Sequence, residues 1–171
     1  MNTIYVNPSE VELKEESVIS INRVSKATTG GRRMRFNSLV VLGDGNGYVG
    51  IGFGKANDVA MAVSKAKEKA KKRIIKVPLI KGTIPHRTDI KHSSVRLMLK
   101  PAGPGTGIIA GGPVREVLSQ LGVKNILSKN TGSTNAINVV RALEFGLLNL
   151  KDPLMIAKQR GITVKQLFSK V

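Results

Sequence analysis

Residues 39–76 read LVVLGDGNGYVGIGFGKANDVAMAVSKAKEKAKKRIIK and carry the clearest structural signals of the chain. An apolar stretch leads into Asp44-Gly45 and Asn46-Gly47, dipeptides that typically connect two antiparallel strands. A glycine-rich second strand follows, and then a helix that we expect to begin after Asn57 or Asp58. Its apolar stripe is predicted at Val59, Val63, Ala66, Ala70 and Ile74. The segment therefore predicts a β-hairpin with a helix packed on it.

The remaining faces of this helix are strongly cationic. They carry Lys65, Lys67, Lys69, Lys71, Lys72, Arg73 and Lys76, with Glu68 as the only acid. The whole chain of 171 residues has 28 Lys and Arg against 11 Asp and Glu, a formal charge of +17. Because bound phosphates relieve self-repulsion of this size, the composition favours a nucleic-acid-binding protein.

The composition disfavours several other classes of protein. Aromatic residues make up 4% of the chain and Trp is absent, whereas proteins that stack single-stranded bases need aromatic platforms. Backbone and shape recognition of RNA fits better. Cysteine is absent, which excludes disulfides, cysteine zinc sites and a thiol nucleophile. No apolar run reaches the roughly 18 residues that a membrane span needs, and no leader segment is evident. We expect a soluble cytoplasmic protein without a membrane partner, a metal, a cofactor or a small-molecule substrate.

The N-terminal half is predicted to contain an acidic arm, residues 1–16, and an α+β domain, residues 17–80. Strands are expected at 17–24, 36–43 and 48–53, forming a three-stranded sheet backed by the lysine-rich helix. Residues 25–35 are expected to form a loop with two glycines at its tip. Glycine lets backbone N–H groups approach a phosphate, and arginine clamps one with paired hydrogen bonds, so we favour RNA contact over an ordinary solvated loop. The residues expected to bind RNA are Arg23, Ser25, Lys26, Thr28, Gly30, Gly31, Arg32, Arg33, Arg35, Lys55, Lys65, Lys69 and Lys72.

Proline and glycine at 78–85 suggest a boundary, followed by a second domain over 81–152 and a helical tail over 153–171. Strands are predicted at 83–92 and 94–102, and a short one at 123–127. A helix should begin at Pro113 and end at Gly122, with an inward stripe at Val114, Val117, Leu118 and Leu121. A second helix should be capped by Thr134 or Asn135, with an inward stripe at Val139, Val140, Leu143 and Leu147. A third should run from Asp152-Pro153 to Arg160 and end at Gly161.

Two glycine-rich motifs resemble phosphate-binding loops by letter. Residues 45–50 match G-x-G-x-x-G, but a strand follows them instead of a helix, and kinase catalytic motifs are missing. Residues 103–112 are predicted to lie directly before the Pro113 helix, where free N–H groups can bind an anion. They lack the lysine and Ser/Thr of a P-loop, so we favour RNA or a protein neighbour over ATP as the ligand of this loop. The glycines can also form a tight turn that lets the helix pack closely on the sheet, whichever ligand binds. Gly105 and Gly107 would let the backbone pass close to that neighbour, and Arg115 would point paired donors at a carboxylate or phosphate across the contact.

The candidates for metal or acid-base chemistry are His86, Asp89 and His92. Their three-residue spacing on a predicted strand alternates faces, so the side chains should not converge. Histidines on the surface near phosphate are the simpler interpretation, and no catalytic residue is predicted.

Five motifs follow one another along the chain: NRVSK at 22–26, VLGDGNGYVGIGFGKA at 41–56, KAKEKAKK at 65–72, GTGIIAGGPVREVL at 105–118 and GSTNAINVVRA at 132–142. In this order they closely resemble the bacterial type of the small-subunit ribosomal protein S5 family. The resemblance covers about residues 17–150. It implies an N-terminal domain like a double-stranded-RNA-binding fold and a C-terminal domain with a βαβ core and left-handed connection, also used by some kinases. It further implies contact of residues 23–35 with ribosomal RNA near the decoding region, and of the glycine loop and Arg115 with ribosomal protein S4.

The resemblance implies a structural, non-enzymatic protein of the small ribosomal subunit that acts in subunit assembly, translational fidelity and the mRNA entry channel. Its other expected neighbours are S8, the nearby mRNA and, at the mRNA entry, S3. A small kinase-like nucleotide-binding protein and a free-standing double-stranded-RNA-binding regulator are the alternatives. A kinase-like protein would have a catalytic base and a serine-rich phosphate loop, and neither is evident. A free-standing regulator would not need a specialised second domain with a glycine loop.

Overall fold

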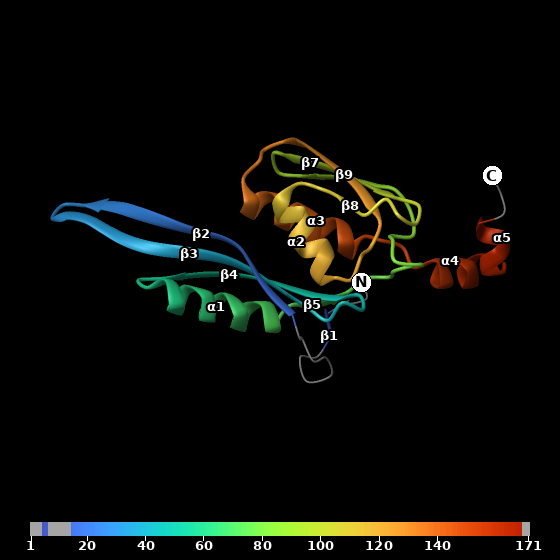
Figure 1. Cartoon of the computed structure of the whole chain (residues 1–171), viewed down its shortest axis with the longest axis horizontal. Helices are drawn as coiled ribbons and strands as arrows, with labels where there is room; N and C mark the ends of the chain where they lie inside the picture. The colour runs from blue at the N-terminus through green and yellow to red at the C-terminus, as the bar shows by residue number, and fades with distance from the viewer. Residues whose placement is uncertain (1–4, 7–14, 169–171) are drawn as a thin grey trace.

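The computed structural model describes residues 5–6 and 15–168, so most of the predicted acidic arm lies outside the described residues. The fold is α+β, with a sheet and helix in the N-terminal part and a second sheet with its own helices after it. The elements stack in layers, with a helix on the outer face of the first sheet and a pair of helices between it and the second sheet (Figure 1). The central pair of helices therefore lies between the two sheets.

The first sheet has five strands in the order β1-β5-β4-β3-β2. Its strands are β1 (Tyr5–Val6), β2 (Glu15–Thr28), β3 (Gly31–Gly43), β4 (Tyr48–Ala56) and β5 (Ile74–Lys76). The prediction of three strands was incomplete because β1 and β5 are two and three residues long and pair with each other from distant parts of the chain. The helix α1 (Val59–Lys71) covers one face of β3 and β4.

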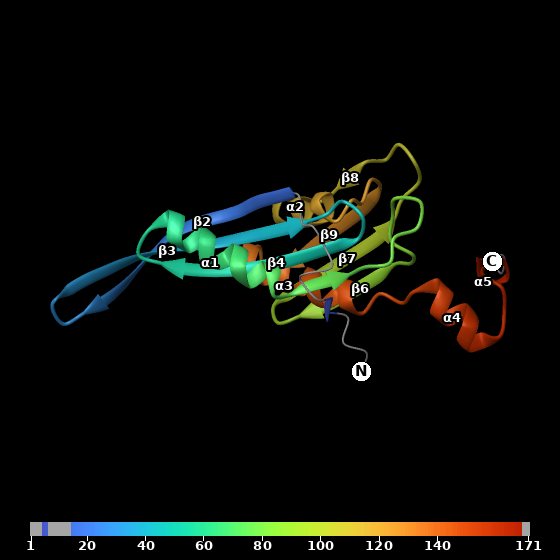
Figure 2. The ribbon, with the colours of Figure 1, turned by 90° about the horizontal axis from the view of Figure 1, so that it is seen from below.

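The prediction of a loop over residues 25–35 is wrong. Strands β2 and β3 pair continuously from Glu15 opposite Gly43 to Thr28 opposite Gly31, with one shift between Val18 and Ser20. The hydroxyl of Thr28 donates to the carbonyl of Gly31 at 3.0 Å and closes the turn. Ladder hydrogen bonds do not require apolar side chains, so this polar stretch remains a strand. The result is a long hairpin that projects from the body at the end opposite the C-terminal helices (Figures 1 and 2).

The glycines of β4 explain how α1 packs on the sheet. A Cβ on Gly52 would overlap the backbone oxygen of Ala66, and one on Gly54 would overlap that of Ala62. Alternate glycines on one strand face thus admit the helix backbone at close range. The buried helix residues are Ala62, Ala66 and Ala70. The predicted stripe is therefore partly wrong, since Val59 is exposed and Ile74 lies in β5.

The second part contains a four-stranded sheet in the order β6-β7-β9-β8. Its elements are β6 (Thr88–His92), β7 (Val95–Pro101), β8 (Ile108–Ile109), α2 (Gly112–Gln120), β9 (Ile126–Gly132) and α3 (Ala136–Leu148). Strands β8 and β9 are parallel and joined through α2, which is the βαβ unit that the resemblance implied. The predicted strand at 123–127 begins three residues later than expected, at Ile126. Both predicted apolar stripes of α2 and α3 are buried.

The C-terminal residues form α4 (Pro153–Arg160) and α5 (Val164–Phe168), which extend away from the body in both views (Figures 1 and 2). The carboxylate of Asp152 accepts a hydrogen bond from Leu154 N at 3.0 Å, and Gly161 ends the helix in the left-handed conformation, as the sequence predicts.

The two parts of the chain share one apolar core and a hydrogen-bonded junction. The core cluster contains Leu39 and Val41 of β3 together with Leu118 of α2 and Leu143 of α3. At the junction, the N–H groups of Gly45 and Gly47 donate to the carbonyls of Gln120 and Leu121 at 3.1 and 3.0 Å. The β3–β4 turn therefore satisfies carbonyls that the end of α2 leaves without helical partners. This use of the glycine turn is structural.

Candidate nucleic-acid interface

The pairing register places the cations of the projecting hairpin on two faces. Lys26 lies directly opposite Arg33, Arg35 is two residues further along β3, and Lys55 lies opposite Asn37. Because opposite residues share a face and alternate residues return to it, these four cations lie on one face. Arg32 is adjacent to Arg33 in β3, and Arg23 lies opposite Phe36, so both point to the other face of the hairpin. The sequence grouped all six cations together, and the structure separates them.

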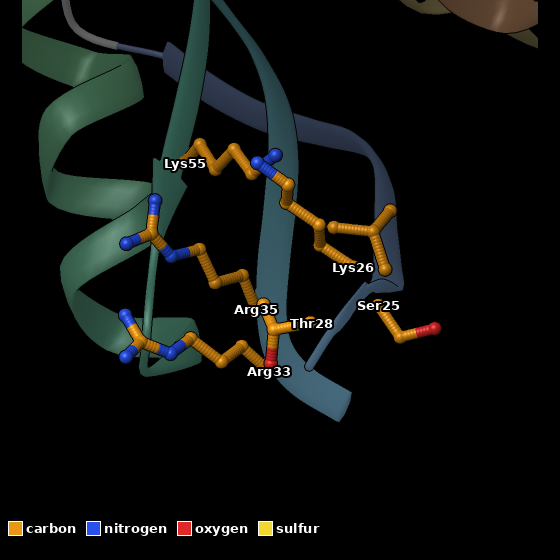
Figure 3. Close-up of a pocket in the computed structure, with 7 residues that line it drawn as sticks. Ser25, Lys26, Thr28, Arg33, Arg35 and Lys55 are labelled. Carbon is orange, nitrogen blue, oxygen red and sulfur yellow. The ribbon is translucent and has the colours of Figure 1, made fainter. Parts of the chain in front are cut away.

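The four-cation face surrounds a cavity of about 250 Å³ between β2, β3 and β4. Its lining comprises Val24, Ser25, Lys26, Thr28, Arg33, Arg35 and Lys55, six of which were predicted to bind RNA. In Figure 3, Lys26 and Lys55 reach toward one another, whereas Arg33 and Arg35 extend side by side in one direction. The hydroxyl of Ser25 points away from the arginines in this view. The cavity thus presents two ammonium and two guanidinium groups at one surface.

This charge is not neutralised within the described residues. Ion pairs in the described part of the chain join Lys67 to Glu16 and Arg87 to Asp89, both outside the cavity. Like charges directly opposite each other destabilise a strand pair, as with Lys26 and Arg33 here. The hairpin is therefore suited to a polyanionic ligand that supplies the missing negative charge.

The hairpin tip is open to a close approach by a ligand. A Cβ added to Gly30 or to Gly31 would meet no heavy atom within 4 Å, and Gly31 has a φ of 133°. Glycine at position 31 is explained by this backbone conformation. Gly30 has no such requirement in the structure, and its absent side chain leaves the backbone accessible.

The predicted helix lysines lie on a separate surface. Lys65, Lys69 and Lys72 are exposed on α1 or at its end. Lys69 and Lys72 line a second cavity, of about 330 Å³, together with Arg73, Arg141 and Glu144. Sequence analysis missed the last two because only the tertiary fold brings these α3 residues to the same cavity as the cations at the end of α1. Burial raises the pKa of the Glu144 carboxyl, while the nearby Arg73 and Arg141 lower it.

The structure does not bring Gly105, Gly107 and Arg115 into one cavity. Gly105 and Gly107 precede the short strand β8, whereas Gly111 caps α2 and Gly112 begins it. The predicted glycine loop over 103–112 is therefore interrupted by a strand. Gly107 N donates to the side-chain oxygen of Asn125 at 3.1 Å, which ties the loop to the start of β9. Arg115, in the first turn of α2, is exposed and lines a separate cavity of about 690 Å³.

His86, Asp89 and His92 make separate contacts, and the strand β6 contains only the last two. Asp89 accepts two hydrogen bonds from Arg87, at 3.0 and 3.2 Å. His86 Nε2 accepts from Lys151 N at 3.2 Å, and the His92 ring packs against Phe145 with centroids 5.6 Å apart. Within residues 5–6 and 15–168, no group of three or more His, Cys, Asp or Glu is placed to hold a metal ion. None of the described helices is long and apolar enough to cross a membrane.

Two family models match the chain. The model described as ribosomal protein S5, N-terminal domain, matches residues 14–78. The model described as ribosomal protein S5, C-terminal domain, matches residues 90–160. The first match covers the projecting hairpin and α1, and the second covers the βαβ unit and α3.

Proposed function

Since the chain belongs to the ribosomal protein S5 family, with a structural and RNA-binding role in the small ribosomal subunit, we propose that the projecting β2–β3 hairpin is its principal rRNA-binding element. Ribosomal proteins are generally non-enzymatic, and the family places the chain in the ribosome and among other ribosomal proteins. The observation that carries the proposal is the face formed by Lys26, Arg33, Arg35 and Lys55, with Lys26 directly opposite Arg33. Phosphates bound there offset a repulsion that the hairpin cannot relieve itself.

Within this proposal, Arg33 and Arg35 clamp backbone phosphates, and Lys26 and Lys55 neutralise the phosphates on either side. Ser25 and Thr28 contribute hydroxyl donors, and Gly30 and Gly31 admit the RNA backbone at the tip. Arg23 and Arg32 contact RNA from the other face of the hairpin. Lys65, Lys69 and Lys72 extend the contact along α1. Recognition of this kind reads backbone position and shape instead of base identity.

The finer roles that we propose are cytoplasmic subunit assembly, translational fidelity and lining of the mRNA entry channel. Gly105, Gly107 and Arg115 dock on ribosomal protein S4, and other faces meet S8, S3 and nearby mRNA. The N-terminal arm (residues 1–16), the two central domains (17–80 and 81–152) and the tail (153–171) remain our proposed divisions.

The salt dependence of binding to small-subunit rRNA tests the hairpin. Each lost phosphate contact reduces the slope of log affinity against log salt by roughly 0.7–0.9. Replacing both Arg33 and Arg35 by Gln should therefore flatten the slope by about 1.5. Replacing Lys158 and Arg160, exposed cations of α4, by Gln is the matched control. Equal slopes for the two double variants would refute the hairpin as the RNA site.

Calorimetry with ATP and Mg²⁺ addresses the kinase-like alternative. We expect no saturable heat, because residues 103–112 lack the P-loop lysine and Ser/Thr and the N–H of Gly107 is already bonded to Asn125. Micromolar binding that Gly107→Val abolishes would instead support a nucleotide site.

A further inference from the structure

A second basic cleft lies where the two parts of the chain meet. Strand β4 pairs with β5 only over Tyr48–Gly50, and the rest of that β4 edge adjoins the cleft. The sheet contributes Leu39, Ile51, Gly52 and Phe53, the end of α1 contributes Lys69, Lys72 and Arg73, and α3 contributes Ile137, Val140, Arg141 and Glu144. The cavity of about 330 Å³ is thus built by elements from both matched domains.

The cleft has an excess of positive charge. Four cations, Lys69, Lys72, Arg73 and Arg141, face one acid, Glu144. In the part of the chain that the structure describes, these side chains form no ion pair within 4.0 Å. The floor is apolar, so an anion bound there is partly removed from water and interacts strongly with the guanidinium groups.

We propose that this cleft binds an RNA backbone phosphate clamped between Arg73 of the first domain and Arg141 of the second. Guanidinium groups suit this task because each presents paired donors to phosphate oxygens. Lys69 and Lys72 continue from the cleft toward Lys65, so a strand of RNA leaving the clamp finds further cations one and two helix turns away. This continuity favours an RNA backbone over a free small anion. The inference rests on the rRNA-binding function proposed above and adds a site that joins the two domains.

Glu144 gives the cleft a distinguishable chemical signature. Its carboxyl already has a raised pKa because of burial. The charged groups that line the cleft with it are Lys69 of α1, Lys72 and Arg73 directly after α1, and Arg141 of α3. A phosphate entering beside it raises that pKa further, so binding takes up a proton and weakens as the pH rises. Replacing Glu144 by Gln removes this contribution and relieves repulsion of the phosphate. The variant should bind RNA more tightly than wild type at pH 7.5, with a smaller difference at pH 5.

The test uses the full chain and small-subunit rRNA. The double variant Arg73→Gln and Arg141→Gln should lower the slope of log affinity against log salt by about 1.5. The control is again Lys158→Gln with Arg160→Gln, which changes the net charge equally. Arg73→Lys preserves charge but not the paired donors, so it should keep the slope and lose affinity severalfold. Thermal unfolding of each variant checks that the shared core is intact. If the double variant does not fold, the affinity of Arg73→Lys still tests the clamp.

The outcomes separate this inference from the proposed function. A slope equal to that of the control, with the hairpin variant Arg33→Gln and Arg35→Gln still reducing it, overturns the cleft and leaves the hairpin proposal standing. If neither double variant reduces the slope, both the cleft and the hairpin proposals are overturned. An Arg73→Lys variant that binds as wild type, or a Glu144→Gln variant that binds more weakly at pH 7.5, also refutes the clamp.

Discussion

The close packing of α1 on β4 predicts that Gly52→Ala will destabilise the protein substantially. The added Cβ would overlap the oxygen of Ala66 and lie 2.7 Å from the nitrogen of Ala70, whereas ordinary contacts begin near 3.4 Å. The obstacle is helix backbone, which cannot rotate aside as a flexible side chain can. The helix must retreat by about 1 Å, for which we expect a cost of about 3 kcal/mol, at the upper end of typical overpacking. In a chain of this size this corresponds to a fall in melting temperature of roughly 6–12 °C.

The matched control is Gly30→Ala, the same substitution on the hairpin of the same sheet. Its Cβ meets nothing within 4 Å, so we expect a change in stability below about 1 kcal/mol. Thermal unfolding of the full chain, followed by circular dichroism, measures both variants. If the two melting temperatures agree within a degree or two, the glycines of β4 do not serve helix packing and the reasoning is wrong.

Three further predictions concern the junction, the cleft and the hairpin tip. Gly122→Ala places a Cβ on the carbonyl of Gly45 at a φ of 86°, whereas Gly105→Ala, at a φ of 87°, places one in open space. Both variants strain the backbone equally, so urea denaturation should show a larger loss of stability for Gly122→Ala. Equal losses would contradict close packing at the junction of the two parts. Glu144→Gln should be more stable than wild type at pH 7, because burial raises the pKa of Glu144 in the folded state and wild type loses stability as the pH rises through that pKa. The difference should vanish near pH 4, about where the carboxyl titrates in the unfolded chain. A variant that is less stable than wild type at pH 7 would show that burial does not penalise the charged carboxylate. Gly30→Val should reduce incorporation into small subunits while leaving the melting temperature nearly unchanged, whereas full incorporation would argue against close RNA approach at the tip.

The sequence predicted elements best where the signal is local. The cap Asn135 accepts from Ile137 N at 3.0 Å, and the stripe Val139, Val140, Leu143 and Leu147 is buried, because capping and helical periodicity involve neighbours in sequence. The pairing of β1 with β5 depends on residues far apart, which no local pattern reports. The polar residues 25–35 look like a loop, yet the ladder with β2 makes them strand.

The candidate site was predicted as a set of residues but not as surfaces. Six predicted residues line the hairpin cavity, whereas Arg23 and Arg32 lie on the opposite face, a division set by the register of β2 on β3. Arg141 and Glu144 were missed because only the tertiary fold brings these α3 residues to the same cavity as the cations at the end of α1. Regular glycines at 50, 52 and 54, with alanines at 62, 66 and 70, did contain the signal for close helix packing, since each set keeps to one face.

The helix α2 links the two proposed contact regions mechanically. Arg115 lies in its first turn, and the next residue, Glu116, accepts a hydrogen bond from the Ser17 hydroxyl of β2 at 2.7 Å. The other end of α2 is held by Gly45 N on Gln120 O. A neighbour that binds Arg115 therefore acts on a helix fixed at two points to the sheet that carries the hairpin. Because these anchors and the shared core join α2 to the sheet that carries the hairpin, docking at Arg115 and RNA contact at Lys26 and Arg33 should be coupled in position. Arg115→Glu is accordingly expected to alter how the hairpin meets rRNA without contacting RNA itself, with the hairpin's hydrogen-bond ladder preserved.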